Sequence, residues 1–167
     1  MLGILERGYK LPQLWDMVVT NYTRRHLTFA KDKLPALGGI ALELHQQTGD
    51  EYMAGIWRSQ LPLALMWNTR KAASRLLSNN RSVEYRAPSW SWACIDGLID
   101  FETSTSDLPL EPENTVKILN VNITTAGPNP FGEVVHGSIN IEGRLKIVEC
   151  GNEKEMGEGP TQDTHRF

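Results

Sequence analysis

The chain has 167 residues, 40% of them hydrophobic and 22% charged, which is enough to bury one sizeable core. Its net charge of −3 gives no reason to expect nucleic acid or an anionic membrane surface as a partner, and no apolar run is long enough to span a membrane. Only two cysteines, Cys94 and Cys150, and an N-terminal segment interrupted by charged residues argue against a secreted disulfide scaffold and favour a cytoplasmic protein.

The first half of the chain has helical periodicity. Apolar residues recur every three or four positions over about 11–25, and Pro12 suits a first turn, which together predict a helix. Asp32 is the candidate N-cap of a second helix that closes near Gly49. The helical spacing continues in Met53, Ile56, Trp57, Leu61, Leu65 and Trp67. We therefore expect helices over about 11–77.

From Ser89 onward the apolar period changes to two, and β-branched residues and turn signals become common. The segment 116–125 predicts a strand with a bulge near Ile118, and 138–147 predicts a half-buried strand or a pair of strands. We expect an α+β fold of one domain over 1–149, with a helical N-terminal half followed by an antiparallel β hairpin or sheet over about 89–148. Residues 150–167 lack any apolar period and predict a disordered tail.

The segment "YRAPSWSWACIDG" carries the strongest hairpin signal, because Asp96-Gly97 suits a two-residue type I′ turn. Pairing across that turn would place one set of side chains on a buried face: Trp90, Trp92, Cys94, Ile99 and Phe101. The opposite face would carry Ser91, Ala93, Asp100 and Glu102. We expect the tryptophans to anchor the core, and the alternative is a stacking platform for a sugar, a base or another small ligand.

Cys94 is the one candidate nucleophile, and a distant histidine such as His136 would have to activate it. Ile99 and the acidic residues downstream predict instead a buried thiol with a raised pKa. The four histidines have no metal-ligand spacing, so we expect neither a metal nor another cofactor. Arg86 is predicted to form a partly exposed ion pair of about 0–1 kcal/mol with Asp96, Asp100 or Glu102, and a basic groove for phosphates is the alternative.

Four sequence blocks occur in order: "LWDMVVTNYTRRHLTFAKDKLPALGGIA", "YMAGIWRSQLPLALMW", "YRAPSWSWACIDGLIDF" and "NPFGEVVHGSINIEGRL". In this order they resemble the region downstream of the HET domain in heterokaryon incompatibility proteins of filamentous fungi. The resemblance covers most of residues 14–145, and "RAPSWSWA" followed by Asp-Gly is its most specific single motif. The residues that carry this motif are Arg86, Pro88, Trp90, Trp92, Asp96 and Gly97. Trp57 and Trp67 in the second block are candidate interaction residues.

The resemblance implies a part in allorecognition, in which fusion of unlike cells triggers programmed cell death and the HET domain is the death-inducing module. The first block already begins at Leu14, so we expect the HET domain itself to be absent, and no catalytic residue is carried over. Cys94 stands where the family usually has serine, and Ile56 stands where it has leucine. The resemblance thus predicts a non-catalytic accessory or regulatory region with a HET domain in cis or in trans as its partner, or else a truncated paralogue or gene fragment.

Overall fold

The computed structural model describes residues 10–25, 27–69, 81–101 and 116–144. Within these residues, two helices precede three antiparallel two-stranded sheets, which confirms the predicted α+β class. The helices are α1 (Leu11–Tyr22) and α2 (Gly38–Thr48), and the strands are β1 (Tyr52–Met53), β2 (Ile56–Trp57), β3 (Trp67–Thr69), β4 (Ile99–Phe101), β5 (Lys117–Thr125) and β6 (Val134–Glu142). The predicted helix after 69, Glu102, the strand beyond 144, Cys150 and the predicted tail 150–167 lie outside the described residues.

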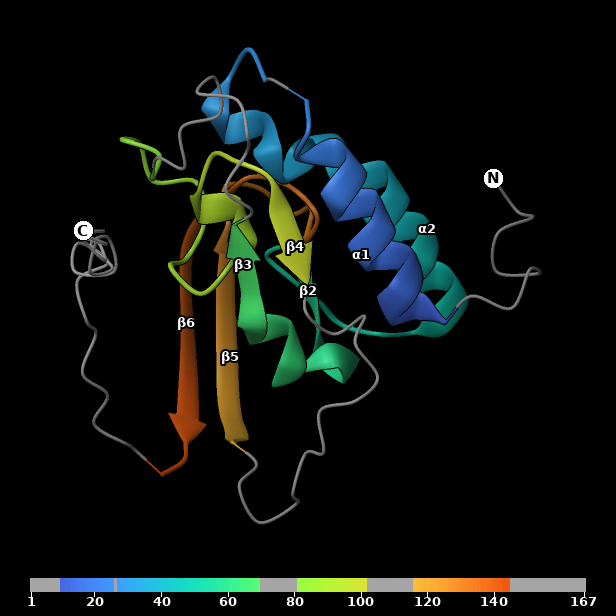
Figure 1. The fold of residues 1–167 in the computed structure, drawn as a ribbon, viewed down its shortest axis with the longest axis vertical. Coiled ribbons are helices and arrows are strands. Elements are labelled where there is room, and N and C mark those ends of the chain that lie inside the picture. Colours follow the sequence, from blue (N-terminus) through green and yellow to red (C-terminus); the bar gives the residue numbers. More distant parts are fainter. Residues whose placement is uncertain (1–9, 26, 70–80, 102–115, 145–167) are drawn as a thin grey trace, which may run out of the picture.

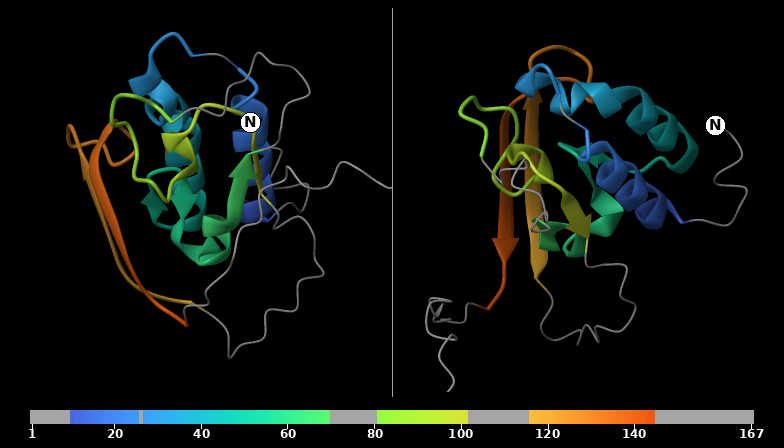
Figure 2. Two further views of the ribbon diagram at one scale, coloured as in Figure 1. Left: turned by 60° about the vertical axis from the view of Figure 1, so that its left-hand side comes forward. Right: turned by 45° about the horizontal axis from the view of Figure 1, so that its top comes forward.

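The elements form three layers (Figures 1 and 2). Helices α1 and α2 lie side by side on one side of the molecule, the short strands β1–β4 lie in the middle, and the long β5–β6 hairpin stands on the other side. None of the helices in the described part of the chain is long and apolar enough to cross a membrane.

Helix α1 forms where its periodicity predicts, although it ends at Tyr22. Its buried residues Leu14, Trp15 and Val19 face the core. The predicted N-cap of the second helix is wrong, because the chain first makes two 3₁₀ turns, Ala30–Lys33 and Pro35–Leu37, before α2 begins at Gly38. Proline has no N–H for an i→i−4 bond, which accounts for the break.

The predicted helix through Met53 and Trp57 is also wrong. Strands β1 and β2 form a tight hairpin in which Met53 pairs with Ile56. The two loop residues both have positive φ, +50° at Ala54 and +97° at Gly55, as a turn matched to the strand twist requires. In so short an apolar run, helical spacing and hairpin spacing cannot be told apart.

The predicted hairpin across Asp96-Gly97 is wrong too. Residues Trp92–Cys94 form a 3₁₀ turn, and β4 pairs with β3 instead, with Trp67 opposite Phe101. The Ser91 hydroxyl accepts a hydrogen bond from the Ala93 N–H at 3.1 Å, and this local cap competes with an extended strand. Both faces of the segment are consequently buried, including Ser91 and Ala93, which the alternation placed on the outer face.

Strands β5 and β6 pair over their whole length, and the predicted bulge near Ile118 is confirmed by a register shift between Ile118 and Asn120. Cross-strand partners give the hairpin one apolar and one polar face. The apolar face comprises Ile118, Val121, Ile123, Gly137, Ile139 and Ile141, and the polar face comprises Lys117, Asn120, Asn122, Thr124, His136, Ser138, Asn140 and Glu142. The end nearest the connecting loop packs on the body through Ile123, Phe131 and Val134.

Candidate functional site

The tryptophan motif is seated on the turn of the first hairpin. The carbonyl oxygen of Gly55 accepts hydrogen bonds from two indole N–H groups, Trp15 Nε1 at 2.8 Å and Trp92 Nε1 at 2.7 Å. One residue earlier, the Ala54 carbonyl accepts a bond of 2.6 Å from the Ser91 hydroxyl. Trp92 and Ser91 are fully buried, so the motif joins α1, the β1–β2 turn and the 3₁₀ turn from the inside.

Two other motif residues, Trp90 and Pro88, connect the motif to β3 and β6. Trp67 donates its indole N–H to the Trp90 carbonyl at 2.8 Å, which ties β3 to the motif. Buried Pro88 packs against Gly137 of β6 so closely that a Cβ at Gly137 would collide with the proline ring. This stretch therefore contacts the helical, middle and hairpin layers.

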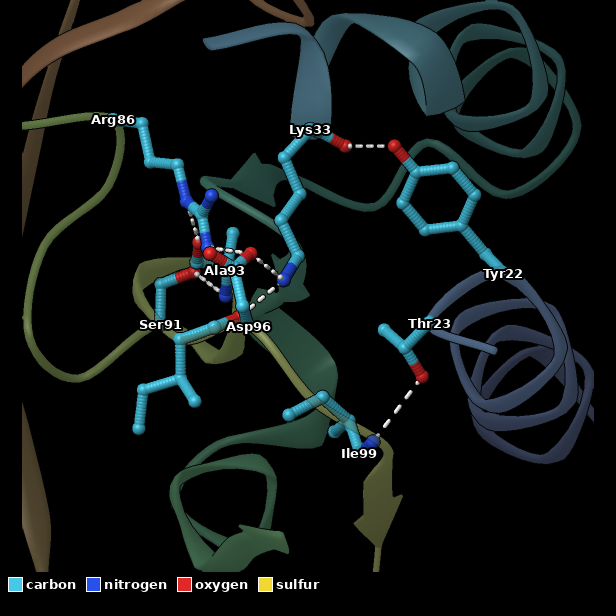
Figure 3. A network of polar contacts seen from close by, with 9 residues as sticks. Tyr22, Thr23, Lys33, Arg86, Ser91, Ala93, Asp96 and Ile99 are labelled. Atoms are coloured by element: carbon cyan, nitrogen blue, oxygen red, sulfur yellow. Dashed lines mark hydrogen bonds and ion pairs between the residues drawn. The ribbon is translucent and has the colours of Figure 1, made fainter. Parts of the chain in front are cut away.

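A charged cluster lies beside the motif (Figure 3). Arg86 donates from Nε to the Ala93 carbonyl at 2.6 Å and from a terminal nitrogen to Asp96 Oδ1, also at 2.6 Å. Lys33, from the 3₁₀ turn after α1, hydrogen-bonds the Ile95 carbonyl and lies 3.5 Å from the same Asp96 oxygen. The two cation side chains are only 2% and 5% exposed, whereas Asp96 is 55% exposed. Two buried cations thus share one carboxylate at the surface as their counter-ion.

The predicted Arg86–Asp96 ion pair is present, but the arginine is buried rather than partly exposed. A buried guanidinium must be paired and hydrogen-bonded, which the Ala93 carbonyl and the Asp96 carboxylate provide. The burial of Lys33 is not predicted by the sequence, because a lysine next to Lys31 and Asp32 is typical of a solvated helix end. No sequence signal marks its burial.

Burial, with the nearby positive charge of Arg86, lowers the pKa of Lys33 from 10.5 to about 8, although Asp96 opposes the shift. For Asp96, partial burial acts to raise the pKa, but the hydrogen bond and charge of Arg86, together with Lys33, outweigh it and hold the pKa below its ordinary value. Tyr22 donates to the Lys33 carbonyl at 2.9 Å, and burial raises its pKa to about 12. The charged groups of the cluster are in direct contact, and Asp96 is the most exposed of the three charged side chains.

Cys94 is 5% exposed, and its thiol donates to the Ser89 carbonyl at 3.6 Å. Burial raises its pKa, as predicted, although Arg81 and Arg86 act to lower it. The predicted pairing with Ile99 is wrong, since β4 pairs with β3. Among the described histidines, His45 bonds the Asp50 carbonyl and His136 lies opposite Thr124 on β5, so neither is a partner of the thiol.

The remaining candidate residues differ in how deeply they are buried. Gly97 is buried, Trp90 and Trp67 are half-buried, and Trp57 is fully buried, which leaves it no surface for an interaction. Trp57 instead packs edge to face on Trp15 and Tyr52, with ring centroids 5.5 and 5.2 Å apart.

Two open hollows lie elsewhere on the molecule. One of about 570 Å³ lies between α2 and β5 and is lined by His45, Tyr52 and Phe131, and one of about 410 Å³ lies between α1 and the turns around Pro62. Neither is lined by Trp90, Trp92 or Cys94. No group of His, Cys, Asp or Glu among the residues placed by the structure could hold a metal ion.

No protein-family model, curated protein or solved structure significantly matches this chain.

Proposed function

We propose that the chain is a non-catalytic accessory or regulatory region of a heterokaryon incompatibility protein, working in the cytoplasm in fungal allorecognition and programmed cell death. Its partner is a HET domain, supplied in cis or in trans. The observation that carries the proposal is the convergence of the four resembling blocks: Trp15 and Trp92 bind one carbonyl, that of Gly55, and Pro88 packs on Gly137.

This convergence explains the motif pattern without a catalytic role. Each block supplies one side of a shared interior contact, so the four blocks are expected to fold as one unit. A scaffold of this kind presents surfaces to another domain and contributes no reacting group.

The geometry favours neither alternative function. A stacking platform on Trp90 and Trp92 needs exposed indoles, whereas Trp92 has 0% exposure and Trp90 is half-buried. A cysteine hydrolase needs a thiolate beside a base, and burial raises the pKa of the Cys94 thiol.

The proposal is tested by co-expressing the chain with a full-length HET-domain protein in a filamentous fungus and scoring cell death and complex formation. We expect the chain to alter the death response, and the Cys94→Ala variant to act like the wild type. The purified chain is expected to hydrolyse neither NAD nor a model ester.

An unchanged death response together with no detectable complex would refute the accessory role. Loss of the effect in Cys94→Ala, with thermal unfolding unchanged, would favour the hydrolase instead.

A further inference from the structure

One edge of strand β5 borders the hollow of about 570 Å³ between α2 and β5. Five consecutive strand residues, 121–125, line this hollow, and the C-terminal end of α2 and strand β1 line it from the other sides. Successive residues of a strand point to opposite faces, so a run of five shows that the strand's edge borders the hollow. Figures 1 and 2 show that this is the edge nearer the body, because β6 lies on the outer side of β5.

The hydrogen-bonding pattern of the β5–β6 ladder determines which backbone groups point to that edge. Burial raises the pKa of the Tyr85 phenol and a hydrogen bond from the Gly137 backbone opposes the rise, so the Gly137 N–H is the donor and points away from β5. Gly137 lies opposite Ile123, which must then also point away from its partner. Because the pattern alternates, Val121 does the same. Within the described part of the chain, no hydrogen bond engages the backbone of Val121 or Ile123 at this edge.

Strand β1 contributes backbone groups of the same kind. The Arg58 N–H donates to the Glu51 carbonyl at 2.9 Å, so the next pair in the ladder, Tyr52 and Trp57, is not hydrogen-bonded. The Tyr52 N–H and C=O therefore point away from β2, and Tyr52 lines the hollow. Two strands thus turn backbone groups that have no partner among the described residues away from their own hairpins, beside one hollow.

The side chains around the hollow favour an uncharged ligand. The lining residues include no lysine or arginine, and their one carboxylate, that of Glu51, already pairs with Arg58 at 3.2 Å. Tyr52, Met53 and Phe131 form an apolar floor that is almost fully buried. A complementary ligand carries N–H and C=O groups at strand spacing, apolar side chains and no charge. An extended peptide has this chemistry.

We propose that the hollow binds an extended, uncharged segment of a partner protein, which pairs through its backbone with the β5 edge at Val121 and Ile123. The five β5 residues that line the hollow span roughly 16 Å, so the bound segment is about five residues long. Backbone hydrogen bonds supply the attraction, and apolar side chains of the segment pack on Tyr52 and Phe131. This inference is independent of the function proposed above.

The blocked peptide acetyl-Thr-Val-Thr-Val-Thr-amide is an uncharged probe of the site, and two-dimensional NMR of the ¹⁵N-labelled full chain follows its binding. We expect saturable shifts of the Val121 and Ile123 amides and a dissociation constant below about 1 mM. The same peptide with every backbone nitrogen methylated has no N–H to donate. It is expected to bind at least about tenfold more weakly.

Val121→Pro removes a donor from the β5 edge and leaves the β5–β6 ladder intact, because the Val121 N–H points away from β6. It is expected to raise the dissociation constant of the probe about tenfold. Val121→Thr is the matched control, since it keeps the N–H and the branched side chain, and it should bind like the wild type. The dispersion of the NMR spectrum verifies that both variants are folded.

Three results would each overturn the proposal. The first is the absence of saturable shifts at millimolar peptide, or shifts confined to residues away from the hollow. The second is equal binding of the methylated and unmethylated peptides, a comparison that needs no variant of the chain. The third is a folded Val121→Pro variant that binds the probe like the wild type.

Discussion

Asp96 is the shared counter-ion of two cations that are almost out of contact with water. Arg86 and Lys33 come from segments far apart in the sequence and meet on one carboxylate oxygen. Lys33 also lies 5.9 Å from the centroid of the Trp92 ring, which adds a weak cation–π contact. The cluster fixes the 3₁₀ turn after α1 against the tryptophan motif.

Asp96→Asn is expected to lower the free energy of unfolding by about 2–4 kcal/mol, because it leaves two buried cations without a counter-charge. The loss is below that for a fully buried pair because Asp96 is 55% exposed. Glu51→Gln is the control: it breaks the exposed Arg58–Glu51 pair of 3.2 Å and should cost about 0–1 kcal/mol. Equal losses for both variants in denaturant unfolding would contradict this account of the cluster.

The lowered pKa of Lys33 predicts a pH dependence. Below about pH 8 the lysine is protonated in both states, whereas between about 8 and its ordinary value of 10.5 the folded chain releases the proton and the unfolded chain keeps it. Unfolding then takes up a proton, so this group makes the free energy of unfolding rise with pH.

We expect the stability of the wild type to rise relative to Lys33→Met from about pH 7.5 to about pH 9.5. The raised pKa values of Tyr22 and Cys94 act in the opposite direction, but they are common to both proteins. Lys31→Met, which removes an exposed lysine, should keep the wild-type slope. A constant difference between wild type and Lys33→Met would show that Lys33 titrates normally.

At the scale of elements, the β1–β2 turn is the point on which the motif depends. Gly55 combines a positive φ with a buried carbonyl that accepts from two indoles, and Trp92 occupies the space that a Cβ would need. A side chain at this position would be strained by the backbone and would also displace the indole.

Gly55→Ala is expected to cost about 2–4 kcal/mol, because its Cβ would lie 2.7 Å from Trp92 Nε1 at a φ of +97°. Gly49→Ala separates the two causes: its φ is +69° but nothing lies within 4 Å of the added Cβ, so it should cost about 1–2 kcal/mol. Thermal or denaturant unfolding of both variants makes the comparison. Similar costs at both positions would mean that the Trp92 contact is loose.

The sequence allowed the α+β class, helix α1, the end of α2 at Gly49 and the bulge near Ile118 to be predicted, since each rests on a local rule. It predicted a hairpin at Asp96-Gly97 that does not form and a helix where the β1–β2 hairpin lies. Asp96-Gly97 has the residues that favour a hairpin turn. In the structure, however, the Asp96 carboxylate binds Arg86 and Lys33, and no local sequence rule predicts these two contacts. Ala54-Gly55 lacks the usual Asn or Asp, and tertiary contacts from Ser91 and Trp92 secure it instead.

At the scale of the whole molecule, the contacts between the long hairpin and the body that involve described residues lie toward one end of the hairpin. The contact of Pro88 with Gly137 and the packing of Phe131 and Val134 lie at that end, while Leu119 and Ile141 toward the other end are 59% and 54% exposed. The hairpin should therefore open as a unit more readily than the helices.

Gly137→Ala is expected to weaken this attachment, because the added Cβ collides with Pro88 and lies 3.0 Å from Ile123 Cδ1. Hydrogen-exchange mass spectrometry should show faster exchange in β5 and β6 with α1 unchanged. Gly127→Ala, in the connecting loop with nothing within 4 Å, should leave both unchanged. Equal loosening of α1 would indicate a single cooperative unit.

The central claim is that the tryptophan motif is buried and joins α1 to the β1–β2 turn from inside the core. Hydrogen exchange of the indole protons, followed by two-dimensional NMR of ¹⁵N-labelled protein and assigned with Trp92→Phe, tests it most directly. The Trp15 and Trp92 indole protons, both donated to the Gly55 carbonyl, should exchange only through global unfolding, with a protection free energy equal to that of denaturant unfolding. Rapid exchange at Trp92 while the α1 amides remain protected would contradict the account.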